Sequence, residues 1–119
     1  MIALGVGLSS SATAEELLGL ADTVLSGAGL SRSAVDLVGT VDRLVDDPRV
    51  QALQLEVRGF TDKQLAQASD SVCEGAALLA VAAPARLLVA KVKGRYTTVA
   101  VACSATAAVG PEQRPERKL

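Results

Sequence analysis

Polar residues that could bind a ligand or act chemically occur in four sets, and the first follows the opening apolar segment. Gly7 is followed by Ser9, Ser10 and Ser11, and a helix is expected to start shortly afterwards. A loop of small residues before a helix N-terminus exposes backbone N–H groups where the helix dipole is positive, which favours phosphate or carboxylate. The segment is therefore either an anion site or a plain turn followed by a capped helix. A dinucleotide fingerprint would need glycine at Ser10, so no Rossmann cofactor is expected.

The second set is Thr40, Asp42 and Asp46, and its first two members end a short apolar segment that is expected to form a strand. Asp42 would then lie at the carboxyl end of a strand, where open α/β sheets usually bind their ligands. A carboxylate at that place could act as a general base if burial raises its pKa. The alternative is a carboxylate that caps a loop.

The last two sets are Ser71 with Glu74, and Lys91 with Lys93. Ser71 and Glu74 have the spacing of a capping box, and the same helix N-terminus could also face a ligand. Lys91 and Lys93 are two residues apart in an expected strand, so they share one face of it. They could bind carboxylates as point charges, or protect an exposed strand edge.

The composition limits the chemistry of these sets. The chain of 119 residues has no histidine, so any mechanism in which this chain supplies an imidazole is excluded. Cys73 and Cys103 are thirty residues apart without a CxxC spacing. We expect both to be buried apolar side chains, the alternatives being a reactive thiol or a disulfide. No metal site and no cofactor are expected.

The charge balance bears on the partners. Twelve basic and thirteen acidic residues give a net charge of −1, which argues against binding a nucleic-acid backbone. Phe60 and Tyr96 are the only aromatic residues, so stacking platforms for bases are scarce. The apolar run before Leu87 is broken by Pro84 and Arg86 before it could span a bilayer, and the N-terminal run lacks basic residues before it. We therefore expect a cytoplasmic protein without a nucleic-acid or membrane partner.

These residues need a scaffold of alternating strands and helices. Apolar runs predict strands over residues 2–6, 39–41, 57–60, 87–92 and 97–102. Capping signals and helical spacing predict helices over residues 13–28, 31–38, 46–57, 61–65 and 71–84. Gly94 and Arg95 would form the turn of a final hairpin. The pattern predicts an α/β fold: a single three-layer domain over residues 1–109, with a small mixed β-sheet flanked by helices. Residues 110–119 are polar and Pro-containing, and we expect them to form a disordered tail.

Three blocks of the sequence resemble, in the right order, the cobalamin-biosynthesis family formed by the C-terminal domain of CbiG and the stand-alone protein CobE. The segment GVGLSSSATAEELL resembles the opening strand, polar loop and helix of that family. The segment TVDRLVDDP is similar to its Thr-hydrophobic-Asp strand end and the acidic Pro-containing turn that follows. The segment SVCEGAALLAVAAPARLLVAKVKGRYTTVAVA resembles its closing helix and hairpin.

The resemblance implies a ligand and a set of residues. In that family CbiG opens a lactone ring on a cobalt-precorrin and releases acetaldehyde, whereas CobE has a less defined task. The implied ligand is a corrinoid or precorrin intermediate, a rigid macrocycle ringed by acetate and propionate groups. The family's matching positions carry over onto Gly5, Gly7, Glu15, Glu16, Thr40, Asp42, Asp46, Ser71, Glu74, Lys91 and Lys93.

The chain also departs from the family pattern. Leu8, Ser9 and Ser10 stand where many members have Cys-Arg-Arg, Leu44 stands where the family has Lys, and the connection over residues 67–70 is short. The lost Cys-Arg-Arg loop, with the absence of histidine and of an evident catalytic triad, favours a non-catalytic accessory module that carries the intermediate or docks on a partner enzyme. The alternative is a cobalt-precorrin hydrolase, or part of one, with Asp42 or Glu74 as acid–base groups. A third interpretation is a degenerate paralogue with a structural role.

Overall fold

The computed structural model describes residues 1–81 and 84–104. The predicted end of the domain at residue 109 and the predicted tail over residues 110–119 lie outside the described residues. The strands are β1 (Ile2–Leu8), β2 (Leu37–Val41), β3 (Glu56–Phe60), β4 (Ala85–Lys93) and β5 (Thr97–Ser104). The α-helices are α1 (Ala14–Gly27), α2 (Pro48–Gln51), α3 (Asp62–Ala68) and α4 (Val72–Ala80), with 3₁₀ turns at Arg32–Ala34 and Asp42–Leu44.

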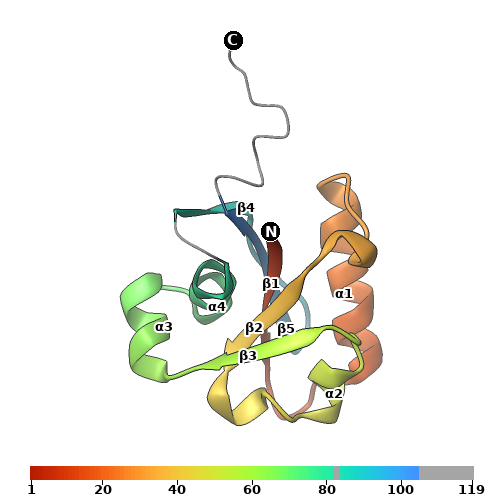
Figure 1. The fold of residues 1–119 in the computed structure, drawn as a ribbon. Helices are drawn as coiled ribbons and strands as arrows, with labels where there is room; N and C mark the ends of the chain where they lie inside the picture. Colours follow the sequence, from red (N-terminus) through yellow and green to blue (C-terminus); the bar gives the residue numbers. More distant parts are fainter. Residues whose placement is uncertain (82–83, 105–119) are drawn as a thin grey trace.

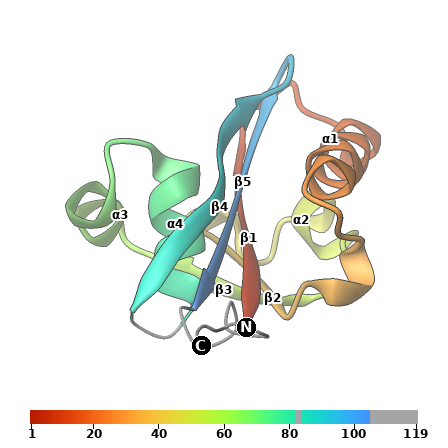
Figure 2. The same ribbon diagram turned by 90° about the horizontal axis from the view of Figure 1, so that it is seen from above.

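The strands form one mixed sheet in the order β3-β2-β1-β5-β4. β1, β2 and β3 are parallel to one another, and β5 runs antiparallel to both β1 and β4. Helices α1 and α2 cover one face of the sheet, and α4, with α3 outside it, covers the other (Figures 1 and 2). The predicted α/β domain with three layers and a mixed sheet is therefore confirmed.

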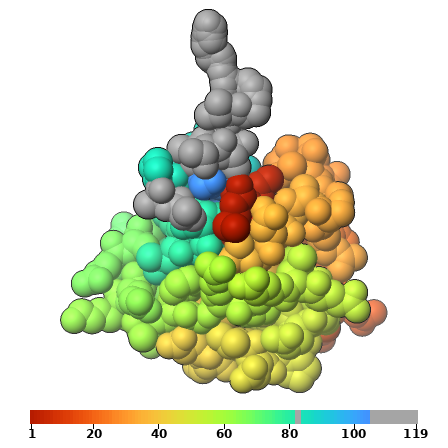
Figure 3. All heavy atoms as spheres, in the orientation of Figure 1, coloured from red at the N-terminus to blue at the C-terminus, as the bar shows by residue number. Residues whose placement is uncertain are grey.

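Most predicted strands and helix starts are confirmed, and three helices are shorter than predicted. The helix expected over residues 71–84 ends at Ala80. The helix expected over residues 31–38 is only the 3₁₀ turn Arg32–Ala34, because every residue of Leu37–Val41 is buried in a central strand. The helix expected over residues 46–57 ends at Gln51, and Val57 belongs to β3. Gln54 has φ 58°, a left-handed conformation that turns the chain into that strand. β3 is an edge strand, and its atoms (yellow-green) lie at the front surface in Figure 3.

The two faces of the sheet are packed differently. On the α1 face, Leu4 and Val6 of β1 and Val38 of β2 contact Leu17 and other large apolar side chains. On the α4 face, most of the buried residues are alanines, with Leu37, Cys73 and Val81 among them, and two glycines of the strands lie under the helix. A Cβ atom added to Gly5 would overlap the backbone of Cys73 and Ala77, so α4 lies directly against the β1 backbone. Gly5 is therefore a packing position inside a strand, not part of a phosphate-binding loop.

The cysteines conform to the prediction, since Cys73 and Cys103 are both buried and free. In the part of the chain that the structure describes, none of the helices is both long and apolar enough to cross a bilayer.

Candidate functional site

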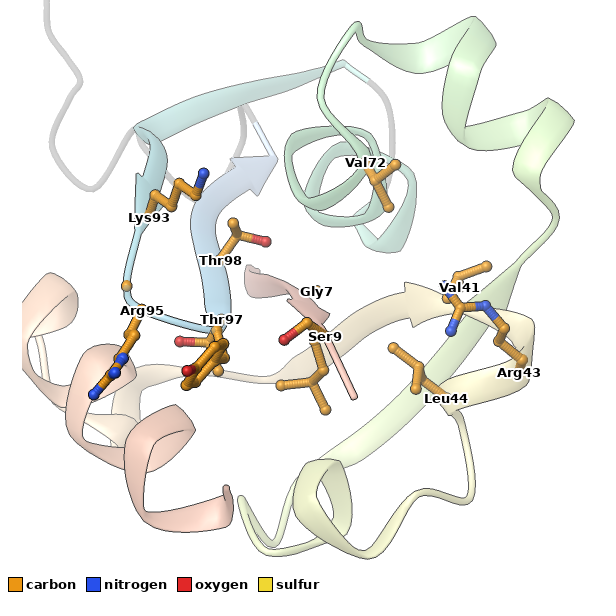
Figure 4. Close-up of a pocket in the computed structure, with 13 residues that line it drawn as sticks. Gly7, Ser9, Val41, Arg43, Leu44, Val72, Lys93, Arg95, Thr97 and Thr98 are labelled. Atoms are coloured by element: carbon orange, nitrogen blue, oxygen red, sulfur yellow. The ribbon is translucent and has the colours of Figure 1, made fainter. Parts of the chain in front are cut away.

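A pocket of about 470 Å³ opens at the carboxyl ends of β1 and β2. The turn between β4 and β5 forms one side of it, and the start of α4 contributes Val72 (Figure 4). This is the place where open α/β sheets usually bind ligands. Its lining residues are Gly7, Leu8, Ser9, Val41, Arg43, Leu44, Val72, Lys93, Gly94, Arg95, Tyr96, Thr97 and Thr98.

The charges on this pocket all have one sign. Arg43, Lys93 and Arg95 line it, and none of the described lining residues is acidic. Arg43 follows β2, whereas Lys93 ends β4, so the two cations come from different sides of the opening (Figure 4). Thr98, Gly7 and Ser9 lie between them. A cleft with cations on two sides favours a ligand that carries several carboxylate or phosphate groups.

The pocket also offers apolar surface. Leu8, Val41 and Leu44 contribute buried or half-buried side chains. Val72 and Tyr96 are 50% and 37% exposed, so the pocket presents part of their apolar surface to solvent. The Arg95 guanidinium lies 5.2 Å from the centre of the Tyr96 ring, within range of a cation–π contact. An anionic ligand with a large apolar body would therefore find partners for both of its parts.

Of the residues predicted to bind a ligand, Gly7, Ser9 and Lys93 line the pocket. A Cβ atom added to Gly7 would come within 2.6 Å of Thr98 Oγ1, so a larger residue there would require the Thr98 side chain to move. Ser10 and Ser11 are exposed and are not among the lining residues.

The second predicted set lies beside the pocket. Thr40 is fully buried, and its Oγ1 donates a hydrogen bond of 3.0 Å to the carbonyl of Val6, which joins β2 to β1. Asp42 follows β2 as predicted, but its exposed side chain lies over Gly59 of β3 and is not among the lining residues. Its neighbour Arg43 lines the pocket instead, whereas the third member of the set, Asp46, is exposed and is not among the lining residues.

Glu74 connects α4 to β4. Its Oε2 accepts a hydrogen bond of 2.8 Å from the Lys91 backbone N–H, and its Oε1 accepts one of 3.2 Å from Ser69 Oγ. Ser71 Oγ caps α4 by accepting from the Glu74 N–H, whereas the Ser71 N–H donates to Ser69 Oγ. The reciprocal half of the predicted capping box is therefore absent between these two residues. Lys91 is exposed and does not line the pocket, unlike Lys93.

Sequence reasoning missed Arg49, which stabilises the loop between β1 and α1. Its Nη1 donates to the carbonyls of Ser9 and Ala12 at 3.1 and 3.0 Å. Its Nε and Nη2 bind both carboxylate oxygens of Asp47, at 2.9 and 2.7 Å. The hydrogen bond from the Arg49 side chain lowers the pKa of the Asp47 carboxyl below its usual 3.8. Arg49 therefore fixes the loop that contains Ser9, and Asp47 fixes Arg49.

The pocket residues Arg43, Arg95 and Tyr96 were also missed. The argument that selected Asp42, its place after a strand end, applies equally to Arg43 one residue later. Arg95 was recognised only as part of the turn. Within residues 1–81 and 84–104, no three Cys, Asp or Glu side chains cluster as they would around a metal ion.

The fold is shared with proteins of known structure. CobE, a protein from the cobalamin biosynthetic pathway, superposes with a TM-score of 0.76 at 23% identity over 86% of this chain and 89% of that one. The cobalamin biosynthesis protein chiG from Agrobacterium tumefaciens gives a TM-score of 0.74 at 21% identity, over 88% of this chain and 99% of that one.

A putative cobalamin biosynthesis protein G homologue from Sulfolobus solfataricus gives a TM-score of 0.69 at 19% identity. The match covers 85% of this chain and 36% of that longer one. No curated protein matches the sequence. The family model described as cobalamin synthesis G C-terminus matches residues 2–102, and the chain therefore belongs to this family.

Proposed function

We propose that this protein binds a corrinoid or precorrin intermediate of cobalamin biosynthesis in the pocket at the ends of β1 and β2. It acts there as an accessory or carrier module in the cytoplasm, passing the intermediate to another enzyme of the pathway. The observation that carries the proposal is the set of three cations, Arg43, Lys93 and Arg95, around a cleft whose described lining residues include no acid.

The chemistry of the ligand class matches both properties of the cleft. A corrin-type macrocycle is a broad apolar plate with acetate and propionate groups around its rim. Val72, Tyr96 and Leu8 offer apolar surface to the plate. Lys93 and Arg43, from different sides of the opening, are placed to meet carboxylates on different edges of one ring.

Binding is favoured over lactone hydrolysis by the positions of the two candidate acid–base groups. Both carboxylate oxygens of Glu74 accept hydrogen bonds: Oε2 from the Lys91 N–H, which joins α4 to β4, and Oε1 from Ser69 Oγ in the loop before α4. The Asp42 side chain lies over Gly59, next to the pocket and not in it. Hydrolysis, the alternative function, would need one of these carboxylates to move.

The experiment is an absorbance titration of the protein with cobyrinic acid, which carries free acetate and propionate groups, and with its fully methylated ester. The acid should bind more tightly than the ester, and its affinity should fall as salt is added, because charge pairs at an open cleft are screened. Equal affinities for acid and ester would contradict the role given to the cations.

Lys93 and Lys91 provide a matched pair of variants. Lys93→Glu should weaken binding of the acid by roughly tenfold, and Lys91→Glu, which makes the same charge change outside the pocket, should leave it nearly unchanged. Adding the lactone-bearing cobalt-precorrin and assaying acetaldehyde tests the alternative. Acetaldehyde release with turnover would replace the carrier proposal by hydrolysis.

A further inference from the structure

We infer that Glu16 of α1 is a positioning residue for this pocket: it fixes the β4–β5 turn so that Tyr96 and its neighbours face the ligand, without touching the ligand itself. The inference rests on the proposed function. It assigns a role in binding to a carboxylate that does not line the pocket. Glu16 belongs to the first helical turn of α1.

Glu16 makes two hydrogen bonds that span the chain. Its Oε2 accepts from the Tyr96 backbone N–H at 2.7 Å and from Thr97 Oγ1 at 3.2 Å. These partners are 80 and 81 residues away in sequence. Hydrogen bonds to a charged acceptor are stronger than neutral ones, so a single side chain is enough to hold a turn of few residues.

The Tyr96 backbone is held from both directions. The Tyr96 N–H donates to Glu16 Oε2, and the Tyr96 carbonyl accepts a hydrogen bond of 2.9 Å from the Ser9 N–H. Ser9 is itself fixed by Arg49, which donates to its carbonyl. With the backbone fixed at both polar groups, the Tyr96 ring remains 37% exposed at the pocket, beside the Arg95 guanidinium.

The turn also packs tightly on α1. A Cβ atom added to Gly94 would lie 3.1 Å from Glu16 Oε2 and 3.1 Å from Leu20 Cδ2. The same added atom would lie 2.9 Å from Thr97 Oγ1, so a larger residue at this position would require these side chains to shift. Glu16 therefore lies against the turn at Gly94, Tyr96 and Thr97. In sequence this turn is flanked by Lys93 and Thr98, which also line the pocket.

The comparison with α3 shows that Glu16 is not used as an ordinary cap. In α3 the Gln64 side chain accepts from the N–H of its own N-cap residue Thr61 at 2.9 Å, which completes a capping box. In α1 the Glu16 N–H donates to Thr13 Oγ1 in the same way, but the Glu16 carboxylate turns outward to the hairpin. In α1 the carboxylate of the N3 residue Glu16 thus accepts from the distant Tyr96 N–H, whereas in α3 the N3 side chain accepts from its own N-cap.

A double-mutant cycle on cobyrinic acid affinity tests this role. Glu16→Ala and Tyr96→Ala should each weaken binding, Glu16→Ala by roughly tenfold. If Glu16 acts through Tyr96, the double variant should bind hardly more weakly than Tyr96→Ala alone, since residues in one network are not additive. The control cycle pairs Glu16→Ala with Arg43→Ala, on the other side of the pocket, where the effects should add. A loss of global stability would not produce this selectivity.

Two further measurements separate a positioning role of Glu16 from a general effect on stability. Glu16→Gln retains a side-chain oxygen acceptor and should restore most of the affinity lost in Glu16→Ala. Hydrogen exchange of the free Glu16→Ala protein should be faster at Tyr96 and unchanged at Leu65 of α3. Additive effects in both cycles, with wild-type binding intact, would overturn the positioning role alone. Absence of binding by the wild-type protein would overturn the proposed function and this inference together.

Discussion

The two faces of the sheet are both covered by a helix, yet they tolerate opposite kinds of change. On the α4 face, alanines lie directly on Gly5 and Gly39, and an added Cβ atom at either glycine would overlap the helix backbone. On the α1 face, Leu17 and other large side chains fill the space between helix and sheet. The α4 face is therefore sensitive to added atoms, and the α1 face to removed ones.

The two helices also use the same residue type differently. Glu16 and Glu74 each stand three residues after a capping hydroxyl, at Thr13 and Ser71. Each carboxylate accepts a backbone N–H of the hairpin, but Glu74 bonds to Lys91, two residues before the end of β4, and Glu16 to the turn at the pocket. We expect Glu74 to contribute to stability and Glu16 to contribute to binding as well.

The largest effect should come from Gly5→Ala. The new Cβ atom would overlap backbone atoms of Cys73 and Ala77, which cannot move without displacing α4. We expect a loss of about 3 kcal/mol or more in the free energy of unfolding, or failure to fold. Gly19→Ala is the control, because Gly19 is an exposed position of α1 and no neighbouring atom lies within 4 Å of the added Cβ atom. It should raise the free energy of unfolding by up to about 1 kcal/mol. Urea denaturation measures both, and equal stabilities would contradict the close contact of α4.

Leu17→Ala should have the next largest effect. Leu17 is fully buried in the α1 face, and its truncation leaves a cavity that costs about 2–5 kcal/mol. Leu79→Ala makes the same change on α4, where the side chain is 37% exposed, and should cost much less. Thermal unfolding of the two variants compares them directly. A similar fall in Tm for both would show that the α1 face is not the side packed by large residues.

Glu74→Ala should lower the free energy of unfolding by about 1–2 kcal/mol, because the Lys91 N–H and Ser69 Oγ lose a charged acceptor. Its affinity for cobyrinic acid should change less than that of Glu16→Ala, since Glu74 bonds to Lys91, which does not line the pocket, whereas Glu16 bonds to the lining residues Tyr96 and Thr97. Urea denaturation and the absorbance titration, performed on both variants, separate the two quantities. A greater loss of affinity in Glu74→Ala would reverse the roles assigned to the two glutamates.

The smallest effect concerns pH. The pKa of Asp47 is lowered in the folded protein by its hydrogen bonds with Arg49, so the ionised form stabilises the fold above the usual value of 3.8. That stabilisation should be lost as the pH falls below 3.8 toward the lowered pKa. The fall in Tm over this range should be less steep in Asp47→Asn than in the wild-type protein. Identical pH profiles would mean that the ion pair contributes nothing to stability.

The fold was largely predictable because its signals are local. Thr13, Thr61 and Ser71 mark helix starts by their own hydroxyl groups, and the hairpin is marked by two apolar runs around Gly94. The segment at Leu37 was misassigned as helix because the choice depends on burial between β1 and β3, which no local pattern contains.

The site was predictable only in part. Gly7, Ser9 and Lys93 were selected from strand ends and alternation, and these features are preserved in the sheet. The roles of Glu16 and Arg49 were not predictable, because each bonds to a segment far away in sequence, 80 residues for Tyr96 and 40 for Ser9. Such contacts depend on how the layers meet, and the spacing of residues along the chain does not contain that information.

The central claim, that the pocket at the ends of β1 and β2 binds a corrinoid through its cations, is tested most directly by an NMR titration. Uniformly ¹⁵N-labelled protein would be titrated with cobyrinic acid while backbone amide shifts are followed. The account predicts saturable shifts at Ser9, Arg43 and the turn around Lys93 and Tyr96, and none around Asp22, which lies in a separate depression on the surface. Saturable shifts confined to residues outside the pocket, or no saturable shift at all, would contradict it.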